Sequence, residues 1–299
     1  MPSPPSRASE ALLTGAVLAG ALPAGAVRRS AERHRANVTT QVTDAVAEEI
    51  PVAFVYNGRP HAVMMATPAD LEDFALGFSL SEAIIAAPAE CEKVEIVPAL
   101  AGIELRITIL PVRAAAIEDR VRELTGRTGC GLCGAQTLDA AVRHPPPVTG
   151  DVCIDERALE SALDQLGQNQ RINAATGATH AAAWVLADGQ IALLREDVGR
   201  HNALDKLIGA MSGRFTPHGG FLIVTSRASY EMVMKAATVG IGALAAISAP
   251  TALAIALAQE TQVVLIGFAR SDGWSVYTFP QRVTAAAPRS GKPSGKSAR

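Results

Sequence analysis

Two short runs in the second half of the chain contain only apolar residues, and they constrain the fold more than any other feature. They span residues 221–224 and 263–266. A strand with one face in water alternates apolar and polar residues, so an unbroken apolar run predicts a strand that is covered on both faces. Patterns of helical period lie between the two runs, starting at Tyr230 and Pro250. Such alternation of strand and helix is typical of an α/β domain.

Further patterns extend this domain over residues 148–285. The spacing of Leu159, Leu163 and Leu166 predicts a helix over 156–166. Asp188-Gly189 predicts the turn of a hairpin over 182–194. A helix over 204–211, a short strand at 246–248 and a last strand over 275–279 complete the prediction.

The first half reads as a smaller α+β domain over residues 37–147. Asn57-Gly58 suits the left-handed positions of a hairpin turn, which predicts a hairpin over 52–65. Thr67-Pro68 predicts the start of a helix with Thr67 as its cap. Two further strands are expected over 92–97 and 103–110.

The two ends of the chain lack these patterns. Residues 1–36 are expected to be a poorly ordered extension, with a signal peptide as the alternative for the apolar stretch 11–27. That stretch is too short and too rich in small residues to span a membrane. Residues 286–299 are expected to form a disordered basic tail.

The bulk composition limits the classes of partner and the compartment. A formal net charge of −2 over 299 residues gives no general attraction to nucleic acid or to an anionic membrane. Four cysteines are too few for a dense disulfide framework in a chain of this length, which favours a reducing, cytoplasmic location. Cys91 and Cys153 are isolated, and we expect them to be small buried apolar residues.

The other two cysteines, Cys130 and Cys133, form a Cys-x-x-Cys pair in the glycine-rich stretch 125–136. Patterns of helical period flank this stretch, and Pro145-Pro146-Pro147 ends the second one. Unpaired N–H groups at a helix N-terminus and the guanidinium of Arg127 both favour a thiolate. We therefore expect a nucleophilic thiol on a glycine-rich segment.

Four kinds of chemistry use such a pair. A structural zinc site needs four ligands, and this pair supplies two. A thioredoxin-like dithiol follows a strand, whereas this pair follows a helical pattern. A zinc deaminase needs a His-x-Glu motif before the cysteines, which is missing. A persulfide carrier needs only one reactive thiol with a helper, and sulfur transfer by it follows the rules of thiol–disulfide exchange.

Polar residues follow the predicted strands at three places. Thr225-Ser226-Arg227 and the stretch Phe268 to Gly273 come directly after the two apolar runs, where α/β sheets gather ligands. The third is the polar run of residues 195–202, predicted to be a loop at a site, with a solvated surface as the alternative. His180 is either a core histidine or part of the site. At the first two places, backbone N–H groups and an arginine suit phosphate or guanine-type polar groups, and no residue is predicted to be a metal ligand.

Five blocks of sequence resemble the formate dehydrogenase accessory sulfurtransferase family, FdhD. They cover residues 129–134, 176–182, 195–206, 226–232 and 248–254, and the likeness extends from about Glu49 to Val283. Two departures stand out. This chain has Glu82-Ala83 where the family has glycine after the glutamate, and Gly177-Ala178 where the family has two glycines.

The resemblance implies a function and partners. The family carries sulfur from a cysteine desulfurase to the molybdenum cofactor, in its bis(molybdopterin guanine dinucleotide) form, before insertion into formate dehydrogenase. Cys130 would carry the persulfide, and Cys133 would assist. The cofactor would be bound by Phe268, Ala269, Arg270, Ser271, Asp272 and Gly273, with Arg227, His201 and Asn202 as further predicted contacts. The resemblance also implies a cytidine-deaminase-like C-terminal domain without zinc chemistry, and a homodimer. The alternatives are a cofactor chaperone that transfers no sulfur and a dithiol oxidoreductase.

Overall fold

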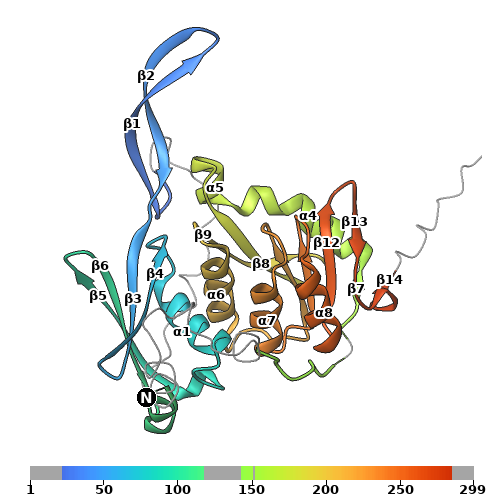
Figure 1. The fold of residues 1–299 in the computed structure, drawn as a ribbon. Helices are drawn as coiled ribbons and strands as arrows, with labels where there is room; N and C mark the ends of the chain where they lie inside the picture. The colour runs from blue at the N-terminus through green and yellow to red at the C-terminus, as the bar shows by residue number, and fades with distance from the viewer. Residues whose placement is uncertain (1–21, 118–142, 151, 285–299) are drawn as a thin grey trace, which may run out of the picture.

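The computed structural model describes residues 22–117, 143–150 and 152–284 (Figure 1). Cys130 and Cys133 lie outside the described residues, as do most of the expected N-terminal extension and the whole expected tail. The described chain forms two halves, each built around its own sheet.

The N-terminal half is a four-stranded sheet with one helix on it. The sheet order is β4-β3-β6-β5, in which β3 and β6 are parallel. Helix α1 (Leu71–Ser81) buries Phe74 and Phe78 against Phe54 of the sheet. Asn57 and Gly58 have positive φ values of 48° and 81°, which confirms the predicted hairpin turn. The strands are β3 (Ile50–Tyr56), β4 (Arg59–Ala66), β5 (Cys91–Ala99) and β6 (Gly102–Ile109), and a short 3-10 helix, η1 (Pro88–Glu90), precedes β5.

The predicted start of the first helix was wrong. Helix α1 begins at Leu71, after Asp70 in a left-handed conformation, and Thr67 does not cap it. Thr67 is fully buried, and its N–H donates to Asp197 Oδ2 at 3.0 Å. Thr67, which the local sequence predicted to be a helix cap, therefore makes a contact between the two halves instead.

The C-terminal half is a six-stranded sheet between two layers of helices. The sheet order is β13-β12-β11-β10-β8-β9, and β10, β11 and β12 are parallel. Helices α6, α7 and α8 cover one face and α4 covers the other (Figure 1). This arrangement confirms the α/β class. The strands are β8 (His180–Leu186), β9 (Ile191–Asp197), β10 (Gly220–Val224), β11 (Ala243–Ala246), β12 (Val264–Arg270) and β13 (Gly273–Val276), and the helices are α4 (Glu156–Asn169), α6 (Arg200–Met211), α7 (Tyr230–Thr238) and α8 (Ala252–Glu260).

Both apolar runs lie in the middle of this sheet. Every residue of β10 is buried, and residues 263–266, the last three of which begin β12, are fully buried. The two runs are therefore covered on both faces, as their composition predicted. Short elements complete this half: α5 (Arg171–Thr176), β7 (Ile154–Asp155), η2 (Pro280–Arg282) and β14 (Val283–Thr284).

A long hairpin projects from the body of the protein (Figure 1). It pairs β1 (Ala26–Arg35) with β2 (Val38–Ala47), and most of its side chains are exposed. Residues 26–36 were expected to belong to a poorly ordered extension, and the structure corrects this. Cross-strand pairs such as Arg33–Asp44, at 2.9 Å, support a ribbon that periodicity alone did not reveal.

The two halves meet along helices α1 and α6. At the crossing, a Cβ on Gly77 would overlap the carbonyl of Asp205, and a Cβ on Gly209 would overlap that of Asp73. The backbones therefore approach as closely as glycine permits. Arg195 adds a contact across this interface, with its Nη2 2.7 Å from Asp73 Oδ2.

Candidate functional site

One edge of the large sheet gathers the chain segments that the sequence singled out. The carboxyl ends of β9, β10, β11 and β12 all meet at this edge, which we call the carboxyl edge. The loops that follow them are tied together by backbone hydrogen bonds. Phe268 N donates to Ser248 O at 3.1 Å, and Thr251 N donates to Ala228 O at 3.1 Å. This is the position at which α/β sheets bind ligands.

Two helices begin at the carboxyl edge without side-chain caps. Helix α6 follows Gly199, and α7 follows Ser229, whose hydroxyl makes no capping bond. Ser229 Oγ and Arg200 Nε are buried and have no hydrogen-bond partner within residues 22–117, 143–150 and 152–284. Free N–H groups and the positive end of the helix dipole favour an anion.

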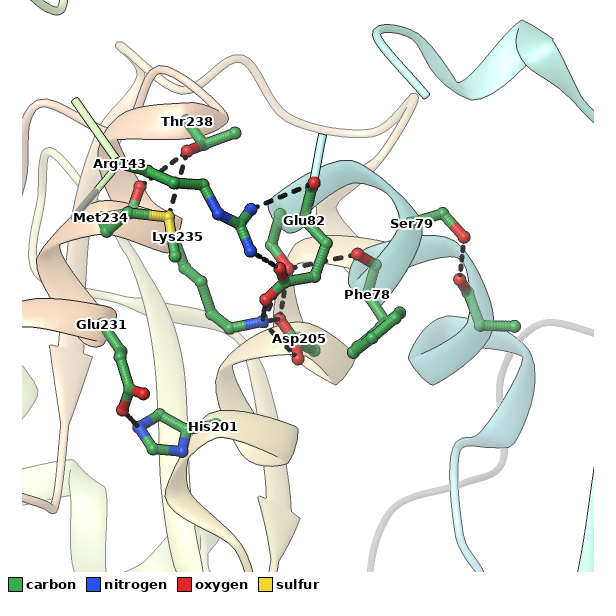
Figure 2. Close-up of polar contacts among 12 residues, drawn as sticks. Phe78, Ser79, Glu82, Arg143, His201, Asp205, Glu231, Met234, Lys235 and Thr238 are labelled. Atoms are coloured by element: carbon green, nitrogen blue, oxygen red, sulfur yellow. Dashed lines mark hydrogen bonds and ion pairs between the residues drawn. The ribbon is translucent and has the colours of Figure 1, made fainter. Parts of the chain in front are cut away.

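Basic side chains surround these two helix starts. His180, Arg200 and His201 are close enough to interact electrostatically. Burial lowers the pKa of His180, and the neighbouring Arg200 and His201 lower it further. His201 Nε2 lies 2.7 Å from Glu231 Oε2 (Figure 2), a bond that lowers the pKa of Glu231. Arg227 is exposed on the loop after β10.

The predicted cofactor stretch, residues 268–273, forms the end of β12 and the turn into β13. A register irregularity lies between Gly267 and Arg270, and Phe268 has a φ of 52° and is 45% exposed. Arg270, Ser271 and Asp272 are exposed at the tip of the turn. Ala269 differs, because its side chain is fully buried in the core on the α4 side of the sheet. Only its backbone is therefore free to meet a ligand.

The polar run of residues 195–202 is not a loop, which corrects the prediction. Its first three residues end β9 and its last three begin α6. Glu196 accepts the N–H groups of Ile172 and Asn173 at 2.8 and 2.7 Å, so its carboxylate caps α5. This carboxylate therefore has a structural task.

Asn202 is also used internally. Its side-chain amide is 3% exposed and donates to Met65 O at 2.8 Å and to Asp197 Oδ1 at 2.9 Å. The prediction that it binds a cofactor is therefore not retained. Lys206, fully buried, lies 2.6 Å from Asp197 Oδ2 and completes this cluster. Sequence reasoning missed the role of Lys206, although the charged pair Asp205-Lys206 between Leu204 and Leu207 was a signal for buried charges.

The described chain breaks off after residue 117 and resumes at Arg143, and both ends are tied to the connection between α1 and β5 (residues 82–90). Residues 111–117 are helical, and Arg113 binds Glu90 at one end of this connection with two bonds of 2.9 Å. Arg143 binds Glu82 at its other end (Figure 2). Cys130 and Cys133 belong to the 25 residues between these points.

The two described cysteines differ from each other. Cys91 is half-buried against the core of the N-terminal half, and burial raises its pKa. Cys153 is exposed, contrary to the expectation that it would be buried. Met232 and Met234 are core residues. Within the described ranges, no cluster of three or more histidine, cysteine or acidic side chains could hold a metal ion.

Comparison with known proteins places this arrangement in a family. The model of the FdhD/NarQ family matches residues 47–284, which include both halves, the carboxyl edge and the Cys-x-x-Cys pair. The chain belongs to the FdhD/NarQ family. The match begins where the projecting β1–β2 hairpin ends, so this hairpin lies outside the part that the family model describes.

Curated relatives are similar over most of their length. The sulfur carrier protein FdhD of Xanthomonas euvesicatoria is 56% identical over 256 residues, which cover 85% of this chain and 91% of the relative. The protein of the same name from Cupriavidus necator is 52% identical over 241 residues, which cover 80% and 84%.

A solved structure shares the fold of this FdhD/NarQ chain. It is the crystal structure of a candidate formate dehydrogenase accessory protein from Desulfotalea psychrophila, with a TM-score of 0.67 and 22% identity. The match covers 87% of this chain and 99% of that one. Within the described residues, no helix is both long and apolar enough to cross a membrane.

Proposed function

We propose that this chain is a sulfur carrier that uses Cys130 to bring sulfur from a cysteine desulfurase to the molybdenum cofactor before its insertion into formate dehydrogenase. The observation that carries the proposal is the combination, on the same chain, of a Cys-x-x-Cys pair with an edge where two helices begin without side-chain caps, an arrangement that suits an anion. Membership of the FdhD/NarQ family and the name of its relatives support it.

The loading step is a thiol–disulfide exchange. The Cys130 thiolate attacks the terminal sulfur of the persulfide on the desulfurase. The S–S bond of that persulfide breaks, a new S–S bond forms on Cys130, and the desulfurase cysteine leaves as a thiolate. The proton on the transferred sulfur stays with it, and no net oxidation occurs.

Delivery as sulfide requires two electrons. A second thiolate, that of Cys133 or of a cellular thiol, attacks the Cys130 sulfur, and HS⁻ leaves toward the cofactor. A disulfide remains on Cys130, and cellular thiols reduce it with two electrons and leave as a disulfide of their own. This step assigns Cys133 the role of helper and allows an external thiol to replace it.

The carboxyl edge is the proposed docking site for the cofactor, which is the cargo. Its bis(molybdopterin guanine dinucleotide) form carries diphosphate groups, and these suit the uncapped starts of α6 and α7 with Arg227 and His201 nearby. Phe268 and the exposed turn at Arg270, Ser271, Asp272 and Gly273 are proposed to contact the guanine nucleotide.

The length of the cysteine segment suits this route. Cys130 lies 13 residues after Ile117 and 13 before Arg143. Thirteen extended residues span up to about 45 Å. Helix α6, with 12 residues, is about 18 Å long, so chain length does not limit access of Cys130 to the carboxyl edge.

Expression of this chain in cells that lack their own FdhD/NarQ protein distinguishes the proposed carrier from a chaperone that only delivers the cofactor. The account predicts that Cys130→Ala abolishes formate dehydrogenase activity while the protein accumulates normally. A chaperone would retain activity in this variant. A dithiol oxidoreductase would lose activity equally in Cys130→Ala and Cys133→Ala, whereas a carrier retains part of it in Cys133→Ala. We propose that the chain acts in the cytoplasm and as a homodimer.

A further inference from the structure

The two-residue turn of the β1–β2 hairpin determines which backbone groups of β2 face away from β1. Residues 36–37 have positive φ values of 47° and 63°, and Arg35 pairs with Val38 across them. The pair that closes such a turn is hydrogen-bonded, and bonded and non-bonded pairs then alternate along an antiparallel ladder. Glu48 N donates to Gly25 O at 2.8 Å, so the alternation holds to the base of the hairpin. The even-numbered residues of β2 therefore bond to β1, and the odd-numbered residues point their N–H and C=O groups away from it.

The β2 edge, as we call it, consists of these outward groups, which belong to Thr39, Gln41, Thr43 and Ala45. In the part of the chain that the structure describes, β2 pairs with no strand other than β1. The hairpin projects from the body of the protein (Figure 1), and Thr39, Gln41 and Thr43 are exposed. A free edge is a template for a further strand, and a two-stranded ribbon alone is only marginally stable in water. The β2 edge is therefore suited to accept another strand.

The two strands of the hairpin differ in charge. Proteins protect free strand edges from unwanted pairing with charged side chains. In β2 the charged residue is Asp44, which pairs with Arg33 of β1 at 2.9 Å. The charged residues of β1 are Arg28, Arg29, Glu32, Arg33 and Arg35. The edge of β1 is therefore protected by charge, and the β2 edge is open to pairing.

Three valines of β2 follow one another at intervals of four residues and therefore share one face of the hairpin. They are Val38, Val42 and Val46, and the first and last are 59% and 41% exposed. The contact of β2 with helix α5 leaves both of these side chains exposed. Antiparallel pairing with a second copy about Val42 places Val38 opposite Val46 of the partner subunit and Val42 opposite Val42 of the partner subunit. The row of valines thus matches itself.

The same register also matches the backbone and the charges. Each outward residue of β2 meets an outward residue of the second copy, for example Thr39 opposite Ala45 of the partner subunit, and about eight backbone hydrogen bonds result. The valines then occupy non-hydrogen-bonded pairs, in which opposing side chains are closest. Asp44 lies opposite Thr40 of the partner subunit, so no like charges face each other.

We propose that the β2 edge binds the β2 edge of a second copy of this chain, about a two-fold axis at Val42. The four strands form one antiparallel sheet in the order β1-β2-β2-β1, with the same surface used on both subunits. A second copy is favoured because the row of valines reads the same in both directions about Val42, as a self-pairing strand requires. The inference goes beyond the proposed function, because the hairpin ends where the family match begins and its pairing involves no sulfur chemistry.

Proline at an outward position tests the pairing in the full chain. Thr43→Pro removes an N–H from the β2 edge and leaves the bonds between β1 and β2 in place. Ser30→Pro is the matched control, because Ser30 pairs with Thr43 and its N–H points away from β2. In analytical ultracentrifugation we expect a wild-type dimer, a dissociation constant raised roughly tenfold or more in Thr43→Pro, and no change in Ser30→Pro.

A pair of double variants tests the register. Val38→Lys combined with Val46→Lys places like charges opposite each other across the two-fold axis, and we expect it to dissociate the dimer. Val38→Lys combined with Val46→Asp places opposite charges there, and we expect it to associate as the wild type does.

Cross-linking tests the position of the axis. In a background of Cys91→Ser, Cys130→Ser, Cys133→Ser and Cys153→Ser, two copies of Val42→Cys would have Cα atoms about 4.5 Å apart, which a disulfide spans. Ala31→Cys, which lies beside Val42 on β1, would be three strand spacings or about 14 Å from its counterpart. We expect mild oxidation to cross-link Val42→Cys into a covalent dimer and to leave Ala31→Cys uncross-linked.

The contrary outcomes overturn the proposal. A wild-type chain that stays monomeric at every concentration tested does so, because the β2 edge then binds no second copy. A wild-type dimer that persists in the double-lysine variant, or a Val42→Cys variant that does not cross-link, shows that the copies meet through another surface. If Thr43→Pro fails to fold, the double variants and the cross-link still decide the question.

Discussion

Lys206 Nζ lies 2.6 Å from Asp197 Oδ2, and both side chains are completely buried where the two halves of the protein meet. Lys206 also donates to the backbone carbonyl of Thr67 at 2.8 Å, and Asp197 accepts the N–H of Thr67. Burial lowers the pKa of Lys206, while Asp197 opposes that shift. The pair thus connects α6 to the chain that enters α1.

Removing one partner of this pair should destabilise the protein strongly. Lys206→Met leaves a buried carboxylate without its counter-ion, so the free energy of unfolding is expected to fall by about 3–5 kcal/mol. Urea unfolding followed by circular dichroism measures this. Arg33→Ala, which breaks an exposed ion pair, should cost only about 0–1 kcal/mol. Equal losses in the two variants would contradict the structural role of the buried pair.

Replacement of glycine by alanine should have opposite effects on stability at Gly209, where α1 and α6 cross, and at Gly167, which lies away from the crossing. Gly209→Ala places a methyl group on the backbone of Asp73 and should cost about 1–3 kcal/mol. Gly167→Ala, on α4, meets no atom within 4 Å and should stabilise the protein by about 0.5–1 kcal/mol through helix propensity. Thermal unfolding of both variants would show shifts of opposite sign, and a stabilised Gly209→Ala would refute the close crossing.

Stability at acid pH should depend on Glu82. Burial raises the pKa of its carboxyl, but Lys235 and Arg143 outweigh burial and lower the pKa from 4.5 to about 2. Between these values the unfolded chain binds more protons than the folded chain, so stability is lost as the pH falls from about 4.5 toward 2. The contribution is about 3 kcal/mol.

Glu82→Gln provides the control for this dependence. It lowers the free energy of unfolding at pH 7 and removes part of the fall between pH 4.5 and pH 2. Equilibrium unfolding across this range measures both. If the free energy of unfolding falls as steeply between pH 4.5 and pH 2 in Glu82→Gln as in the wild type, other carboxyl groups cause the fall.

The carboxyl edge should bind a guanine nucleotide through Arg227. Arg227→Ala removes a charge-assisted contact with phosphate and is expected to weaken binding of guanosine diphosphate by roughly tenfold or more, measured by calorimetry. Asn202→Ala is not a suitable comparison, because the Asn202 amide supports the interface between the two halves. Arg33→Ala, which removes the same charge from the β1–β2 hairpin, is the matched control. If the two variants bind the nucleotide with equal affinity, Arg227 does not contribute to the site.

The sequence predicted local patterns well and contacts between distant residues poorly. Residues 221–224 were recognisable as a doubly covered strand, and Asn57-Gly58 as a hairpin turn, because short-range geometry determines both. Thr67 was assigned to a helix cap, whereas Asp197, 130 positions away in sequence, takes its N–H. No local pattern carries that information.

The same limit applies to the site. Residues 195–202 were recognised as chemically unusual, but two of their polar side chains have structural tasks. Glu196 caps α5, and Asn202 supports the buried interface between the two halves. Arg227 and the turn at Arg270 were predicted as site residues from their position after buried strands, a rule that depends on sheet topology. The ion pairs at the two ends of the cysteine segment join Arg113 to Glu90 and Arg143 to Glu82, and only the folded chain brings them together.

The most direct test of the central claim is mass spectrometry of this chain after incubation with a cysteine desulfurase and cysteine. The account predicts the added mass of one sulfur atom on the peptide that contains Cys130, its removal by a reducing thiol, and its absence in Cys130→Ala but not in Cys133→Ala. Absence of added sulfur in the wild type, or labelling that persists in Cys130→Ala, would contradict a carrier that works through Cys130.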